Sequence, residues 1–126
     1  MHPIKYPAAE LAGEGEPKHR WITHPVEGGW SGPVISEWEL TAESWTDHHP
    51  HDEYVYVLAG RLLIEANSVT VEAGPGDMVC VPRDAIGRYW APVYARMLSI
   101  YGPNPEGKPS RNLAFQRLTY PLDPGF

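Results

Sequence analysis

Side chains of the metal-ligand type crowd the stretch TDHHPHDEYVYVLAG, residues 46–60. Three histidines and three acids fall within the seven residues from Asp47 to Glu53. Imidazoles and carboxylates are the usual protein ligands for zinc, iron, nickel, copper and manganese. The stretch therefore presents two alternatives: a metal site, or a polar loop that leads into a strand.

The spacing of these residues indicates that some of their side chains point the same way. Side chains two residues apart point the same way along an extended chain. Four ligand-type residues share that parity: Asp47, His49, His51 and Glu53. Pro50 interrupts the pattern, because a proline donates no hydrogen bond to a sheet ladder. We therefore expect the histidines on a loop at the mouth of a strand that begins near Glu53.

Short strands separated by turn residues are predicted on both sides of this stretch. The 12 glycines and 14 prolines leave almost no helical apolar period that lasts three turns. Strand-like runs are predicted at 33–40, 53–60, 61–66, 69–73, 78–81, 87–92 and 94–102. Short strands at regular spacing predict an all-β protein, either a sandwich or a small closed barrel.

The two ends of the chain differ from this central region. A chain of 126 residues has the size of one domain. The predicted division of that domain is an N-terminal arm over 1–32, a barrel core over 33–102 and a C-terminal tail over 103–126. The arm is rich in Pro, Gly and Glu, with one ordered piece at 20–24, and the tail has an apolar patch around Leu113, Phe115 and Leu118. Both ends suit an intersubunit contact, so a homodimer is expected.

Charge and composition limit the classes of partner. The formal net charge is -6, with acids and bases scattered along the chain, whereas a nucleic-acid-binding protein would show a basic stripe. No apolar run is long enough to span a bilayer, and the N-terminus lacks the basic start and apolar core of a signal peptide. The single cysteine, Cys80, suits a reducing compartment. We therefore expect a cytoplasmic protein whose partner is a small-molecule ligand or substrate, not nucleic acid or a membrane.

The opening stretch also resembles the first motif of the cupin family. In outline that motif is Gly, five residues, His-x-His, three or four residues, Glu, six residues and Gly. Glu53 is followed here by six residues and then Gly60. Counting back with the three-residue spacing puts His49 at the second histidine and Asp47 at the first. Thr41 stands at the position of the opening glycine, so that feature is absent.

The second cupin motif is matched only in part. In outline it is Gly, five residues, Pro-x-Gly, two residues, His, three residues and Asn. The run GDMVCVPRDAIGRYWA matches it at Gly76 and Pro82. Asp84 stands at the position of the second glycine, Gly87 at that of the histidine and Ala91 at that of the asparagine. The fourth metal ligand of the family is therefore missing.

The resemblance covers residues 33–101 and implies a cupin-type antiparallel β-barrel, also called a jelly roll or double-stranded β-helix. The altered ligands look most like those of small single-domain cupins akin to the ethanolamine-utilisation cupins, some of which lack the usual metal set. The ligands that remain are Asp47, His49 and Glu53, with His51 as a substitute. One imidazole and two carboxylates favour manganese or iron, with zinc or nickel as alternatives. A protein without a metal ion is the other possibility.

Two classes of function follow from this resemblance. The first is a metal-binding enzyme that acts on a small polar or carbonyl-bearing metabolite, as cupin dioxygenases, isomerases and lyases do. The second is a non-catalytic, metal-free cupin that binds or senses a small molecule, with extra room at Gly87 for the ligand, water or a side chain such as Tyr89. Four residues are candidate ligand contacts: Trp38, Tyr89, Arg96 and Tyr101. The region of the arm with His19, His24 and Trp30 could fold across the barrel mouth or pack on a partner subunit.

Overall fold

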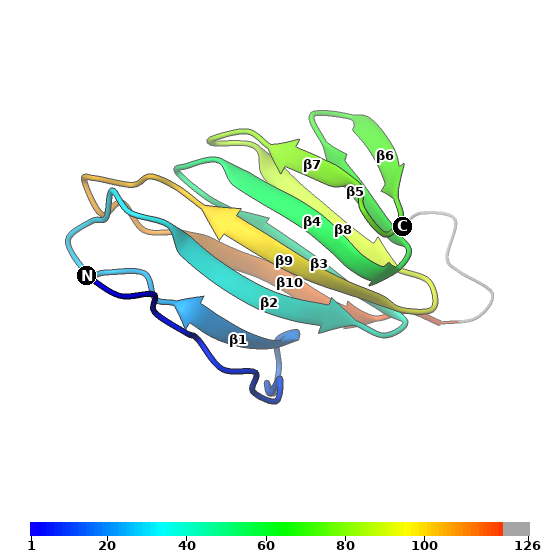
Figure 1. The fold of residues 1–126 in the computed structure, drawn as a ribbon. Coiled ribbons are helices and arrows are strands. Elements are labelled where there is room, and N and C mark those ends of the chain that lie inside the picture. Colours follow the sequence, from blue (N-terminus) through cyan, green and yellow to red (C-terminus); the bar gives the residue numbers. More distant parts are fainter. Residues whose placement is uncertain (120–126) are drawn as a thin grey trace.

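The computed structural model describes residues 1–119 of the chain, and the last part of the predicted tail, 120–126, lies outside the described residues. The described part is all-β, as predicted, and its strands form two antiparallel sheets that face each other (Figure 1). The strands are β1 (Lys18–Thr23), β2 (Val34–Leu40), β3 (Glu43–His48), β4 (Glu53–Gly60), β5 (Leu62–Ala66), β6 (Val69–Ala73), β7 (Met78–Val81), β8 (Ile86–Ala91), β9 (Ala95–Tyr101) and β10 (Arg111–Arg117). Within residues 1–119, no helix has the length and apolar character needed to cross a membrane.

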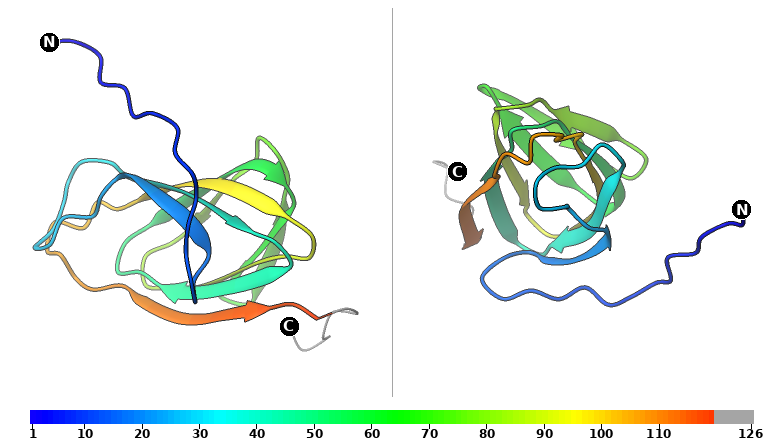
Figure 2. Two further views of the ribbon diagram at one scale, coloured as in Figure 1. Left: turned by 90° about the horizontal axis from the view of Figure 1, so that it is seen from below. Right: turned by 90° about the vertical axis from the view of Figure 1, so that its left-hand side faces the viewer.

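The order of the strands is that of a barrel whose chain passes repeatedly from one sheet to the other. The first sheet has the order β1-β2-β9-β4-β7, and the second has the order β10-β3-β8-β5-β6. Figure 2 shows the two sheets wrapped around a common interior. Alternate side chains of each strand point into this interior. The core contains aliphatic and aromatic residues of both sheets, among them Trp38, Leu40, Val55, Val57, Leu62, Ile64, Tyr89 and Met97.

Two strands lie where the sequence predicted no ordered element. The first is β3, which directly precedes the histidine cluster and turns Trp45 and Asp47 toward the interior, so it lacks the apolar alternation of a typical strand. The second is β10, which lies in the predicted tail and pairs with β3. Its register shifts between Asn112 and Ala114, which interrupts the alternation. Phe115 of the predicted apolar patch packs against Trp45, with ring centroids 6.3 Å apart.

The predicted arm contributes the edge strand β1 to the first sheet. In the β1–β2 pair His19 lies opposite Trp38, and Trp21 lies opposite Ser36. The arm therefore pairs with its own barrel at this point. The N-terminal end of the arm extends away from the barrel (Figure 2), whereas the backbone oxygen of Pro7 accepts a hydrogen bond from Nη1 of Arg20 at 3.2 Å.

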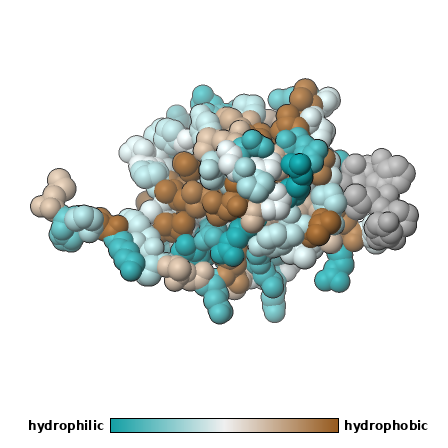
Figure 3. Space-filling model, turned by 45° about the vertical axis from the view of Figure 1, so that its right-hand side comes forward, coloured by the Kyte–Doolittle hydropathy of each residue, from teal (hydrophilic) through white to brown (hydrophobic). Residues whose placement is uncertain are grey.

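The outer surface of the barrel carries apolar side chains as well as charged ones (Figure 3). Tyr54 and Leu58 of β4 are 39% and 42% exposed, and Met78 of β7 is 52% exposed. On the extended arm, Ile4 is 72% exposed. The homodimer expected from the sequence stays a prediction.

Candidate metal centre

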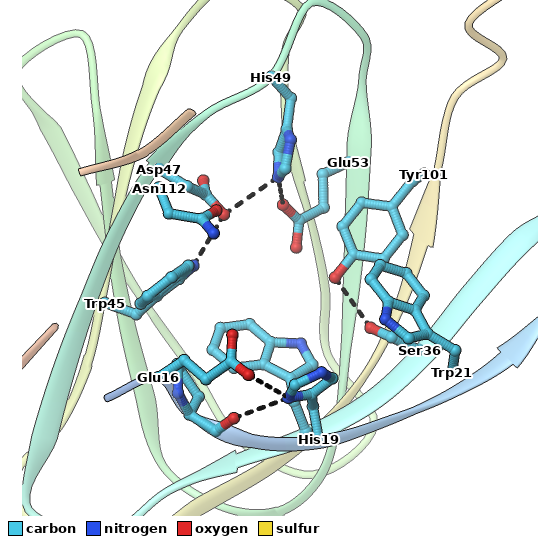
Figure 4. Close-up of a pocket in the computed structure, with 12 residues that line it drawn as sticks. Glu16, His19, Trp21, Ser36, Trp45, Asp47, His49, Glu53, Tyr101 and Asn112 are labelled. Atoms are coloured by element: carbon cyan, nitrogen blue, oxygen red, sulfur yellow. Dashed lines mark hydrogen bonds and ion pairs between the residues drawn. The ribbon is translucent and has the colours of Figure 1, made fainter. Parts of the chain in front are cut away.

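Three ligand-type side chains come together where β3 passes into β4. Asp47 lies near the end of β3, His49 lies in the connection between the strands, and Glu53 begins β4. One ligand atom from each residue lies within 4.8 Å of the other two. Because β3 and β4 belong to different sheets, the cluster bridges the two sheets (Figure 4). We call these three residues the candidate metal centre.

The imidazole of His49 lies at the middle of this centre. Its Nε2 is 3.0 Å from Oδ2 of Asp47 and 3.2 Å from Oε1 of Glu53. These are ion-pair distances, and this buried nitrogen has no other polar partner among the described residues. Oδ1 of Asp47 is also buried without a partner. On the far side of the ring, Nδ1 of His49 is fixed by the hydroxyl of Ser110 at 2.6 Å.

The carboxylate of Glu53 is held by the barrel wall. It is 1% exposed, and each of its oxygens accepts a hydrogen bond. The hydroxyl of Tyr89 donates to Oε1 at 3.1 Å, and the hydroxyl of Ser99 donates to Oε2 at 3.0 Å. Nε1 of Trp38 in turn donates to Oγ of Ser99 at 2.8 Å. Partners of this kind fix the orientation of a ligating carboxylate.

The charges of the centre require a positive charge between the two carboxylates. Burial alone would lower the pKa of His49, but the carboxylates of Asp47 and Glu53 outweigh burial and raise this pKa to about 10. Burial and repulsion by Asp47 raise the pKa of Glu53. The position of Nε2 is therefore electrostatically favourable for a cation, either a proton on the imidazole or a metal ion.

The donor set fits a divalent metal ion. Oδ1 of Asp47 is a buried polar atom without a hydrogen-bond partner, and such an atom costs about 1–3 kcal/mol unless something satisfies it. Nε2 of His49 lies between two carboxylate oxygens, at 3.0 and 3.2 Å. One nitrogen and two carboxylate groups form a hard ligand set of the type that suits manganese and iron. The fixed Nδ1 of His49 is also typical of a metal-ligating histidine, whose second nitrogen usually has a partner of its own.

His51, the fourth predicted ligand, lies beside this group but not in it. Its ring stacks on the ring of His49 with centroids 4.8 Å apart. Its Nδ1 lies 2.9 Å from the backbone oxygen of Asp52, and Trp30 packs edge-on against it at 5.4 Å between centroids. Burial lowers the pKa of His51. The contacts of His51 therefore support the position of the His49 ring.

Tyr89 fills the space beside Gly87. A Cβ atom added at Gly87 would lie 2.8 Å from the hydroxyl oxygen of Tyr89 and 3.0 Å from Cε2 of its ring. Of the possible occupants of this space, the structure therefore identifies the tyrosine side chain. Since the same hydroxyl donates to Glu53, Tyr89 replaces the missing side chain at position 87 with a hydrogen bond to the candidate metal centre.

The candidate metal centre opens onto a cavity of about 120 Å³ between the sheets (Figure 4). Four aromatic side chains line it: Trp21, Trp38, Trp45 and Tyr101. The hydroxyls of Ser36 and Tyr101 are hydrogen bonded to each other at 2.8 Å. The cavity therefore combines aromatic walls with polar groups at defined places.

The four residues predicted to contact a ligand differ in whether they reach this cavity. Trp38 and Tyr101 line it, whereas Tyr89 is completely buried and reaches it only through Glu53. Arg96 lies on the outer face of the first sheet, where its Nε donates to Oε2 of Glu37 at 2.6 Å. The structure therefore does not bring Arg96 to the cavity.

Several residues of the site were not predicted as site residues. Ser36 and Ser99 stand at inward positions of β2 and β9, and Glu16 and His19 line the cavity from the arm. A serine on the apolar face of a strand is a usable signal, because a buried hydroxyl needs a hydrogen-bond partner. The role of Glu16 depends on how the arm folds, so its position has no comparable signal.

A profile of the cupin domain matches residues 36–101 of the chain. This chain belongs to the cupin family. Among solved structures, this cupin is similar to the EutQ protein of Clostridium difficile, with 24% sequence identity and a TM-score of 0.53 over 56% of this chain and 52% of that chain. It therefore matches about half of the length of that protein.

Two further solved structures are matched over most of their length. KdgF from Halomonas sp. has 17% identity and a TM-score of 0.62, with 76% of this chain and 88% of that chain covered. A cupin-like protein from Thermotoga maritima has 14% identity and a TM-score of 0.65, with 80% and 78% covered. The comparison with curated proteins found no match. At these identities the similarity shows the fold, and it confirms the predicted cupin jelly-roll barrel.

Proposed function

We propose that this cupin is an enzyme that binds a divalent metal ion through Asp47, His49 and Glu53 and acts on a small polar or carbonyl-bearing metabolite. The observation that supports the proposal most strongly is the set of ligand atoms within 4.8 Å of one another at the cavity wall. Two buried atoms of the set, Oδ1 of Asp47 and Nε2 of His49, have no hydrogen-bond partner. Manganese and iron are favoured, with zinc and nickel as alternatives.

The residues around the centre have separable roles in this proposal. When bound, a divalent ion supplies Lewis acidity that polarises a carbonyl or enediol oxygen or activates water. Tyr89 and Ser99 hold the carboxylate of Glu53 in one orientation. The rings of Trp38 and Trp45 exclude water from the cavity beside the centre and offer flat surfaces to a ligand.

The alternative function is a metal-free cupin that binds or senses a small molecule. The observation that favours it is the pKa of His49, which the two carboxylates raise to about 10. An imidazolium at this position would provide the positive charge that the centre requires without any metal ion. The ligand would then form hydrogen bonds with Asp47 and His49 directly.

Elemental analysis of protein purified without a histidine tag separates the two functions. The proposal expects about one equivalent of a transition metal per chain, and its loss in His49→Ala. His48→Ala is the matched control, because His48 is adjacent in sequence but lies outside the group of ligand atoms. Metal content far below one equivalent that is the same in the wild type and in His49→Ala would support the metal-free alternative.

A further inference from the structure

The cavity has a second polar end, opposite the candidate metal centre. His19 of β1 and Glu16, just before this strand, line the same cavity as the metal centre. Figure 4 shows His19 and Glu16 across the cavity from His49. Trp38 and Trp45 also line the cavity. A ligand enclosed there would therefore meet polar groups at two ends and aromatic rings along its length.

The segment that carries this second end is held in place by the backbone. Ala12 and His19 exchange two hydrogen bonds of 3.1 Å between their backbone groups. The loop between them turns at Gly15, whose φ of 72° favours glycine. β1 then pairs His19 with Trp38 on β2. The imidazole of His19 is therefore fixed at the edge of the first sheet, with 27% of its side chain exposed.

One nitrogen of His19 is occupied, and the other is left for a ligand. Nδ1 lies 2.9 Å from the backbone oxygen of Pro17. A carbonyl oxygen only accepts hydrogen bonds, so Nδ1 carries the hydrogen, and Nε2 of the neutral ring is an acceptor. Within residues 1–119, Nε2 has no hydrogen-bond partner. An imidazole oriented through one nitrogen, with the other open to a cavity, is suited to bind a donor group.

We propose that the ligand of this cupin has two polar ends and that His19 recognises the end remote from the metal centre. Oxygen atoms at one end meet the metal centre, and a hydroxyl or NH group at the other donates a hydrogen bond to Nε2 of His19. Glu16 lines the cavity beside His19, with its Oε1 4.0 Å from Nδ1 of this imidazole. The inference rests on the proposed function and extends it by naming a second group of the ligand.

The size of the cavity limits what lies between the two ends. Its volume of about 120 Å³ is close to that of apolar cavities of about 150 Å³ that accept a molecule of benzene. The part of the ligand that lies in this cavity is therefore about the size of one six-membered ring. A short-chain oxo or hydroxy acid with a distal hydroxyl group has the required size and both polar ends.

The test compares matched probes on the full chain loaded with Mn²⁺. The probes are 2-oxo acids of increasing chain length, each with and without a terminal hydroxyl group, and affinity is measured by isothermal titration calorimetry. At one chain length the hydroxylated acid should bind about 3- to 10-fold more tightly, as expected for one additional hydrogen bond. His19→Phe should remove this preference and leave the affinity for Mn²⁺ unchanged. His19→Gln should retain part of it.

The controls separate this inference from the proposed function. His24→Phe changes a histidine that does not line the cavity, so the preference should persist. Equal affinities for both acids at every chain length, or a preference that survives in His19→Phe, would overturn the inference. If His19→Phe fails to fold, His19→Ala provides the same comparison. Absence of Mn²⁺ binding, measured first by electron paramagnetic resonance, would overturn the proposed function instead.

Discussion

Two clusters of charged side chains lie on opposite faces of the first sheet. On the outer face, both oxygens of Glu37 accept hydrogen bonds, from Nε of Arg20 at 2.8 Å and from Nε of Arg96 at 2.6 Å. On the inner face, Glu53 of the same sheet belongs to the candidate metal centre, whose other two residues each have a buried atom without a hydrogen-bond partner. Both clusters contain buried carboxylates, but they differ in how completely these carboxylates are paired with positive charges.

The difference distinguishes a cluster that stabilises the fold from one that is suited to bind a ligand. Burial acts to raise the pKa of Glu37, but Arg96 and Arg20 outweigh it and hold this pKa below its usual value. Burial and the nearby Asp47 instead raise the pKa of Glu53. The outer cluster is thus electrostatically complete, whereas the inner cluster gains from a further cation. Unpaired buried groups beside a cavity are a stronger indication of function than an ion pair is.

The largest expected difference between the clusters concerns metal affinity. Asp47→Asn and Glu37→Gln make the same chemical change, from carboxylate to amide, on the two faces. Asp47→Asn should weaken Mn²⁺ binding by about 100-fold or more, because even changes in the partners of metal ligands cost about 10- to 100-fold. Glu37→Gln should leave the affinity unchanged. Calorimetric titration checks both, and similar affinities in the two variants would contradict the distinction.

The stability of the fold, in contrast, should depend on the outer cluster around Glu37. Glu37→Gln removes the charge that pairs with Arg20 and Arg96, and should lower the free energy of unfolding by about 1–2 kcal/mol. Glu72→Gln is the matched control, since Glu72 pairs with Arg61 at 3.3 Å and its side chain is 57% exposed. An exposed pair contributes only about 0–1 kcal/mol. Urea unfolding provides the measurement, and an equal loss in both variants would remove the special role of Glu37.

A smaller effect on Mn²⁺ affinity is expected when Glu53 loses the hydrogen bond that Tyr89 donates to it. Tyr89→Phe removes the hydroxyl that donates to Oε1 of Glu53 and leaves the ring in the core. Mn²⁺ affinity should fall by about 10-fold, the lower end of the range for such partners. The fold should persist, which near-ultraviolet circular dichroism can verify. Unchanged affinity would mean that Tyr89 supports packing only.

The smallest expected effect is a pH dependence of the contribution that Glu37 makes to the free energy of unfolding. Because the pKa of Glu37 is lower in the folded chain than its usual value of 4.5, the ionised carboxylate stabilises the fold above pH 4.5. This contribution is lost as the pH falls below 4.5 toward the lowered pKa. The difference in unfolding free energy between wild type and Glu37→Gln should therefore shrink in acid. A difference that stays constant from pH 6 to about pH 3 would contradict the assigned cause.

The sequence identified the three residues that the structure brings together at the candidate metal centre. The spacing from Glu53 to Gly60 sets the register of this motif, and the register selects His49 and Asp47 among several candidates. Tyr89 was one of three possible occupants of the space beside Gly87, with a ligand and water, and the structure places its side chain there. Both placements depend on local spacing along extended strands, which the sequence shows directly.

Other features depend on contacts between distant segments. Arg96 was predicted as a ligand contact, but β9 carries apolar residues on both faces, so its alternation does not show that Met97 points inward and Leu98 outward. The strand β10 has an irregular register and owes its place to pairing with β3. The role of His19 follows from the fold of the arm, which no spacing within the arm predicts.

The central claim is tested most directly by a crystal structure of the protein grown with Mn²⁺, with anomalous scattering used to locate the ion. The account predicts one strong anomalous peak within coordination distance of Nε2 of His49 and of carboxylate oxygens of Asp47 and Glu53. Crystals of Asp47→Asn grown in the same way should lack this peak. A fully occupied peak elsewhere, or no peak in the wild-type protein, would contradict the account.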